Sequence, residues 1–167
     1  MRALGIDPGI ARLGWGIISE EKASQKVIDF GCIQTTKNQP EEERLKILFE
    51  KLKKIIQKYK PDVMAVEDLF FAANLKTASR VGQARGVVLL AASLKNIPIK
   101  VYTPLNIKMA IVGYGRAEKS QVQQMVKTIL KLDKVPKPDD TADALAVALT
   151  HCFLYQFQAA KAKTCNL

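Results

Sequence analysis

The 167 residues of this chain predict one α/β domain built on a mixed sheet. Three observations support that fold class. Short runs of β-forming residues, separated by turn residues, open the chain. Longer stretches with helical periodicity then alternate with two further short apolar runs. Hydrophobic residues make up 48% of the chain, which is enough for one core at this length.

Five segments are expected to form the sheet. Residues 2–7, 12–19 and 26–36 alternate or run apolar and are divided by turns, which predicts an antiparallel meander. Residues 61–67 and 97–102 are short apolar runs that predict two more strands. Together they give a five-stranded mixed sheet, because strands separated by helices pair in parallel.

A helix is expected over residues 38–60, where Pro40 suits the first turn and acidic residues follow it. Its apolar stripe consists of Leu45, Leu48, Phe49, Leu52, Ile55 and Ile56. Further helices are expected over residues 70–96, 104–112, 117–132 and 139–158. The second of these five helices is apolar on all sides from Val87 to Ala92, so we expect it to be buried on more than one side.

The chain is expected to be a single domain over residues 1–158, with residues 159–167 as a frayed C-terminal tail. No run is long enough to span a bilayer, and the start has no hydrophobic signal region. The three cysteines form no CxxC pair, which favours free thiols in a reducing compartment. We therefore expect a cytoplasmic protein that has no membrane partner.

The charge balance indicates a polyanionic partner. Lysine and arginine number 26 against 16 acidic residues, a net charge of +10. Such an excess is typical of nucleic-acid-binding proteins. Its alternative explanation is that the lysines only keep the surface soluble.

Two predicted strands end on acids. The stretch "LGIDPGIARLGWG" carries a strand that ends on Asp7, and the strand "PDVMAVE" ends on Glu67. A buried carboxylate is costly unless it is paired or binds a cation. Because ligands gather outside the carboxyl ends of parallel strands, Asp7 and Glu67 are expected at one edge of the sheet.

A third group of acids begins the last helix. Asp140 and Asp143 are three residues apart, so they share a helix face. Carboxylates brought together repel unless a cation sits among them, and oxygen-only ligands suit Mg²⁺ or Mn²⁺. Four of them indicate a site for two metal ions that promotes displacement at a phosphate.

Each acid also has a simpler explanation. Asp140 and Asp143 resemble a helix-capping pattern, Glu67 could be an ordinary loop acid, and Asp7 could cap the following turn. Asp139 is an alternative to Asp140 as a ligand, since it lies on the same face as Asp143. We prefer Asp140 as the ligand and assign Asp139 to the helix cap.

Several longer motifs carry a family resemblance. "GIDPG", "EDLFFAANLKTASRVGQARG", "IVGYGRAEKSQVQ" and "DDTADALAVALTHC" occur in order and cover nearly the whole chain, from Arg2 to Cys152. In this they closely resemble the RuvC family of bacterial Holliday-junction resolvases. The resemblance implies an RNase H-like fold and a Mg²⁺-dependent homodimer that nicks two strands of a four-way DNA junction in recombination and repair. It also implies the motor and junction-binding proteins RuvA and RuvB as partners.

The resemblance assigns roles to residues of this sequence. The family's four catalytic carboxylates fall on Asp7, Glu67, Asp140 and Asp143, the same set that strand ends and helix spacing indicate. Its two active-site lysines fall on Lys108 and Lys119. Lys119 also lies in the first turn of a predicted helix, where a cation opposes the helix dipole.

Other residues are candidates for DNA contact. Lys76, Arg80, Arg85 and Arg116 are candidate phosphate ligands, and Tyr114 lies in a loop between two glycines. The family's aromatic residue at the junction centre matches Phe70 by its spacing from the acid before it, although Phe71 is adjacent. We expect Phe70 to stack on DNA and Phe71 to pack inward.

Three other functions share some of these sequence features. An actin-like or sugar-kinase ATPase needs two such domains and a second phosphate loop, and this chain offers neither. A non-catalytic nucleic-acid-binding module explains the charge but not the converging acids. A related nuclease acting on structured RNA uses the same chemistry, so only a cleavage assay separates it from a junction resolvase. The single histidine, His151, is expected to be a packing residue rather than a ligand.

Overall fold

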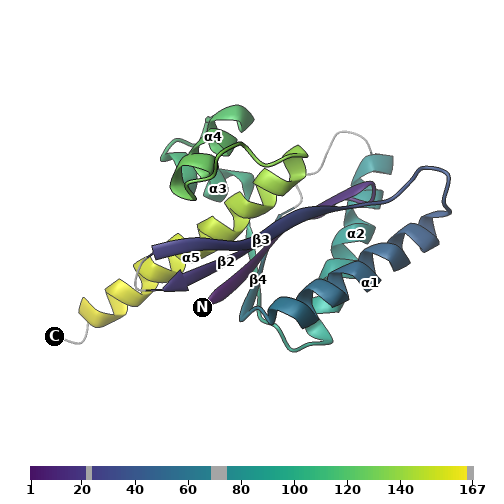
Figure 1. Cartoon of the computed structure of the whole chain (residues 1–167), viewed down its shortest axis with the longest axis horizontal. Coiled ribbons are helices and arrows are strands. Elements are labelled where there is room, and N and C mark those ends of the chain that lie inside the picture. Colours follow the sequence, from purple (N-terminus) through teal and green to yellow (C-terminus); the bar gives the residue numbers. More distant parts are fainter. Residues whose placement is uncertain (22–23, 69–74, 165–167) are drawn as a thin grey trace.

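A computed structural model describes residues 1–21, 24–68 and 75–164 of the chain (Figure 1). Five strands form one sheet in the order β3-β2-β1-β4-β5. Their bounds are Arg2–Asp7 (β1), Arg12–Glu21 (β2), Ser24–Gln34 (β3), Val63–Glu67 (β4) and Ile99–Tyr102 (β5). Strands β1, β2 and β3 pair antiparallel, whereas β4 pairs in parallel with both β1 and β5. The predicted mixed five-stranded sheet is confirmed, as is its opening meander.

Helices cover both faces of the sheet. They span Glu41–Tyr59 (α1), Leu75–Ser93 (α2), Pro104–Val112 (α3), Lys119–Ile129 (α4) and Asp139–Thr164 (α5). Helices α1 and α2 lie on one face, and α3, α4 and α5 lie on the other (Figure 1). Within the described ranges, no helix combines the length and the hydropathy that a membrane span needs.

Helix α1 packs as its pattern predicts. Leu48, Leu52 and Ile56 are buried against the sheet, since they recur at helical spacing along one face. Its acidic first turn, from Glu41 to Glu43, faces the positive end of the helix dipole.

Helix α5 lies directly on the sheet because two strand glycines leave room for its backbone. A Cβ atom on Gly5 of β1 would lie 2.1 Å from the carbonyl oxygen of Ala144. One on Gly14 of β2 would lie 1.8 Å from the carbonyl oxygen of Asp140. Any side chain at either position would push α5 away. The glycines therefore bring the acidic start of α5 against the carboxyl end of β1.

Two helix expectations were wrong in part. Helix α5 does not end near Gln158 but continues to Thr164, since the added residues include alanine and lysine, which favour helix. The division into a domain over residues 1–158 and a tail over residues 159–167 remains a prediction. Helix α2 buries Val88, Ala91 and Ala92, but the predicted burial on more than one side does not extend to Leu90, which is 53% exposed, or to Leu94, just beyond the helix end, which is 61% exposed.

Candidate active site

An open pocket of about 360 Å³ lies at the carboxyl ends of β1 and β4. Five residues with predicted catalytic roles line it, together with apolar residues of α3, α4 and α5. These five are Asp7, Glu67, Asp143, Lys108 and Lys119. The parallel pairing of β1 with β4 places Asp7 and Glu67, the last residues of their strands, at one edge of the sheet.

The helices supply the other three side chains. Asp143 lies in the second turn of α5, whose close approach to the sheet was described above. Lys108 comes from α3, and Lys119 is the first residue of α4. Three helices and two strands thus converge on one pocket.

The strand acids are held in an unfavourable setting for negative charge. Burial, and after it the charges of Glu67, Asp143 and Asp140, raises the pKa of Asp7 to about 8. Burial, followed by the charge of Asp143, raises the pKa of Glu67 to about 7. Such shifts are typical of carboxylates placed together for function.

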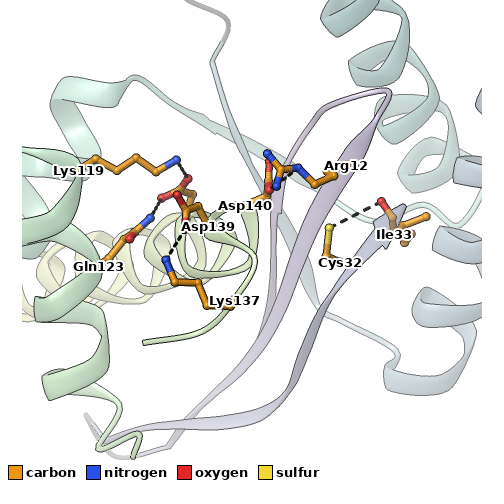
Figure 2. A network of polar contacts seen from close by, with 9 residues as sticks. Arg12, Cys32, Ile33, Lys119, Gln123, Lys137, Asp139 and Asp140 are labelled. Carbon is orange, nitrogen blue, oxygen red and sulfur yellow. Dashed lines mark hydrogen bonds and ion pairs between the residues drawn. The ribbon is translucent and has the colours of Figure 1, made fainter. Parts of the chain in front are cut away.

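Helix α4 provides two partners for Asp143. The Nζ atom of Lys119 lies 2.6 Å from its Oδ2 atom, and the Gln123 side-chain amide donates a hydrogen bond to Oδ1 at 3.3 Å. Figure 2 shows both side chains reaching the start of α5 from α4. Although burial opposes it, the hydrogen bond to Asp143 raises the pKa of Lys119. Gln123 was not among the predicted site residues, and its sequence signal is its spacing of four residues from Lys119.

Asp140 is placed differently from the other three acids. Its Oδ2 atom lies 3.1 Å from Nε of Arg12, at the start of β2. Among the described residues that line the pocket, Asp140 is absent. Asp139, the alternative ligand, pairs with Lys137 at 2.7 Å. Its expected role as the helix cap is wrong, because α5 begins at Asp139 itself.

The described candidate DNA contacts come from α2 and from the connection between α3 and α4. Arg80 pairs with Glu41 at 3.3 Å, and Arg85 lies 3.7 Å from Asp68. Two more candidates are exposed in the connection from α3 to α4: Tyr114 and Arg116. The remaining candidates lie where side chains are not described: Phe70, Phe71 and Lys76.

His151 fits its expected packing role. It is 5% exposed, and its Nδ1 atom lies 2.7 Å from the Tyr102 hydroxyl.

The donor set at the pocket suits a hard divalent cation, since the candidate ligands are carboxylate oxygens. Asp140 Oδ2 is shielded from solvent and, within the described part of the chain, accepts no hydrogen bond. A buried oxygen of this kind is stabilised by a hydrogen-bond donor or a cation. In the same described residues, no three acidic, histidine or cysteine side chains are grouped tightly enough to hold a metal ion in this arrangement. The chemistry of the donors therefore fits a metal ion. In this arrangement, however, the described carboxylates are not close enough together to bind one.

Known proteins match nearly the whole chain. A family model described as "Crossover junction endodeoxyribonuclease RuvC" matches residues 3–151. A protein of that name from Alkaliphilus oremlandii is 55% identical over 157 residues, covering 94% of this chain and 96% of its own. Another, from Fusobacterium nucleatum, is 52% identical over 151 residues, covering 90% and 80%.

The fold matches as closely as the sequence. The solved structure "T. thermophilus RuvC in complex with Holliday junction substrate" has a TM-score of 0.90 and 36% identity, covering 95% of this chain and 96% of the other. The mixed sheet with its flanking helices is thus RNase H-like, as the resemblance implied. With the match of family model, sequence and fold, the chain belongs to the RuvC family of crossover junction endodeoxyribonucleases.

Proposed function

We propose that this endodeoxyribonuclease resolves four-way Holliday junctions by paired, symmetric nicks, through metal-dependent hydrolysis of DNA phosphodiester bonds in recombination and repair. The observation that carries the proposal is the pocket at the ends of β1 and β4. It gathers three carboxylates and two lysines in a chain of net charge +10. A binding module has no need of partly buried acids facing a polyanion, because they repel it.

The four acids are the proposed metal ligands: Asp7, Glu67, Asp140 and Asp143. Family nucleases are metal-dependent. We propose Mg²⁺, replaceable by Mn²⁺, and two ions per site, because four carboxylates exceed what one ion needs. Bound ions would supply an activated water and charge stabilisation at the leaving oxygen. The raised pKa values of Asp7 and Glu67 support this, because a cation would relieve their repulsion.

The two lysines are proposed to act on the phosphate. Lys108 and Lys119 line the pocket from α3 and α4, opposite the strand acids. Positioned cations stabilise the negative charge that builds up on a phosphoryl group during displacement. Lys119 also fixes Asp143 through its 2.6 Å contact, so it both orients an acid and offers charge.

A homodimer is proposed because a junction must be cut in two strands, and two-fold symmetry supplies two equivalent sites. The exposed apolar side chains Leu90 and Leu94, at the end of α2, support a second copy as the partner. Assembly with RuvA and RuvB is proposed from the family resemblance alone.

DNA binding is proposed to use basic residues of α2 and of the α3–α4 connection together with two aromatic residues: Lys76, Arg80, Arg85, Arg116, Tyr114 and Phe70. Phosphate contacts position a nuclease on DNA, whereas a stacked aromatic can hold strands apart. The free thiols of Cys32 and Cys152 favour the proposed cytoplasmic location.

One assay tests the proposal. The protein is incubated with a mobile four-way junction, a matched duplex and a structured RNA, in Mg²⁺ or in Ca²⁺. We expect symmetric nicks in the junction with Mg²⁺ and binding without cutting with Ca²⁺. Preferential cutting of the RNA, or equal cutting of the duplex, would contradict junction resolution.

A further inference from the structure

Two of the three acids of α5 are each bound by a cation from another element. Lys119 of α4 holds Asp143 at 2.6 Å, and Arg12 of β2 holds Asp140 at 3.1 Å. Figure 2 shows these contacts on either side of the start of α5. Only the Lys119 contact faces the pocket, since the described pocket lining includes Lys119 and Asp143 but neither Asp140 nor Arg12.

The contact between Arg12 and Asp140 is an ion pair without a hydrogen bond. The Asp140 oxygen that faces Arg12, Oδ2, is shielded from solvent, and none of the described residues donates a hydrogen bond to it. A buried carboxylate oxygen left in this way is costly, so it favours any cation that can satisfy it better.

The Arg12 side chain can break its ion pair with Asp140 at little cost. Its side chain is 54% exposed, against 21% for Asp140, and it begins β2 next to the turn after Asp7. A guanidinium on the surface loses little when an ion pair breaks, because water solvates it. Asp140, by contrast, sits on a helix fixed against the sheet by Gly14.

We propose that Arg12 is a positioning residue that holds Asp140 outside the carboxylate pocket and must release it before Asp140 can bind a metal ion. The proposal rests on the proposed function and adds a competition to it: Arg12 and a metal ion compete for the same Asp140 oxygen, because two cations beside one oxygen repel each other. The observation behind this competition is the Arg12 contact at 3.1 Å to an Asp140 oxygen that has no hydrogen-bond donor among the described residues.

The test measures Mn²⁺ binding to the full chain without DNA, by isothermal titration calorimetry. Arg12→Ala should tighten the binding of Mn²⁺ by about two- to fivefold, the range that an ion pair with one exposed partner covers. Arg12→Lys, which keeps the charge, should lie between wild type and Arg12→Ala. Thermal unfolding checks that each variant is folded, and Arg12→Gln replaces Arg12→Ala if that variant is not.

Lys137→Ala is the matched control. It removes one positive charge at the same helix end, where Lys137 pairs with Asp139 and is 71% exposed. No resolvable change in Mn²⁺ affinity is expected, because exposed charges are screened. Tighter binding in this variant and not in Arg12→Ala would overturn the proposal and make Asp139 the ligand.

A double-mutant cycle separates competition from a general charge effect. In the Asp140→Asn background, Arg12→Ala should no longer tighten Mn²⁺ binding, because the contested carboxylate is gone. A gain that persists there, or unchanged or weaker binding in Arg12→Ala alone, would overturn the proposal.

Junction cleavage by the wild type in Mg²⁺ is scored separately: if the wild type cuts junctions and the Mn²⁺ result fails, only this inference falls. If the Mn²⁺ result holds and no junction is cut, only the proposed function falls.

Discussion

Asp7 has the most strongly raised pKa of the acids at the site. It ends a buried strand, and both burial and neighbouring acids raise its pKa from 3.8 to about 8. It is therefore the carboxylate that gains most from a bound cation and costs the metal-free fold most. One substitution at this residue tests both consequences.

We predict that Asp7→Asn binds junctions but does not cut them in Mg²⁺. The amide keeps the size of the side chain and removes the charge that would hold a metal. Gel shift in Ca²⁺ measures binding, and single-turnover cleavage in Mg²⁺ measures cutting. Cutting at the wild-type rate would rule out the assigned metal site.

The same variant should be more stable than wild type in EDTA, by a margin that grows with pH. The folded wild type keeps a proton on Asp7 that the unfolded chain loses above its ordinary pKa of 3.8, so wild-type stability falls as pH rises toward 8. Asparagine has no proton to lose. Thermal unfolding at pH 5 and pH 8 should show the gain at pH 8 exceeding that at pH 5 by more than about 1 kcal/mol. Exposed Asp133→Asn should show no such growth.

The two adjacent phenylalanines carry a separate prediction, which lies outside the described residues. Phe70→Ala should keep the fold and junction binding but slow cutting sharply, since a base stacked on an aromatic side chain is worth about 1–3 kcal/mol. Phe71→Ala should mainly lower the midpoint of thermal unfolding.

A 2-aminopurine base at the crossover reports on the stacking step. Its fluorescence should rise when wild type binds and stay low with Phe70→Ala. If Phe71→Ala is the variant with impaired cutting, the two roles are reversed.

At this scale the sequence predicted residues with a local signal and missed those without one. Asp7 and Glu67 were found because each ends an apolar run, and Asp143 because of its helical spacing. Arg12 was missed because an arginine at the start of a strand has no local pattern. Its contact with Asp140 exists only once the β1–β2 hairpin and α5 are packed together.

At the scale of elements, the contact between α5 and the sheet decides whether the acids meet. The strands and the parallel pair were predictable from apolar runs and their order. The length of α5 was not, because helix-favouring residues continue past the last apolar one. The tight packing at Gly14 was likewise invisible in one dimension, since the atom it avoids lies over 120 residues away in the chain.

We predict that Gly14→Ala lowers the free energy of unfolding by about 1–3 kcal/mol, as overpacking does, and reduces cutting by shifting the start of α5. The new methyl group meets the Asp140 carbonyl, which is backbone and cannot rotate away. Gly82→Ala on α2 is the matched control: nothing lies within 4 Å of its added Cβ. Its stability in denaturant should be unchanged or higher by about 0.5–1 kcal/mol, because alanine favours helix over glycine. An equal loss in both variants would contradict the packing argument.

At the scale of the whole molecule, the exposed leucines at the end of α2 carry the prediction of a dimer. Leu90→Glu should convert the proposed dimer to a monomer at micromolar concentration, because a charge cannot be buried unpaired between two copies. Sedimentation velocity measures the change. Leu105→Glu, at an equally exposed leucine on the other face of the sheet, should leave the sedimentation unchanged. A wild type that is monomeric and fully active would argue against two coupled sites.

The net charge of +10 sets the remaining prediction, which concerns how the whole surface meets DNA. If binding depends on phosphate contacts, log affinity for a junction should fall linearly with log salt, with about 0.9 in slope for each phosphate neutralised. Several contacts give a slope of several units, measured by fluorescence anisotropy in Ca²⁺ so that no strand is cut.

Arg116→Gln, in the connection between α3 and α4, should lower the slope by about one. Lys54→Gln, on the exposed side of α1, should leave it unchanged, because α1 carries none of the proposed DNA contacts. Equal losses of slope in the two variants would mean that the positive charge attracts DNA in general and that Arg116 makes no particular phosphate contact. A flat salt response in the wild type would mean that the excess charge takes no part in binding.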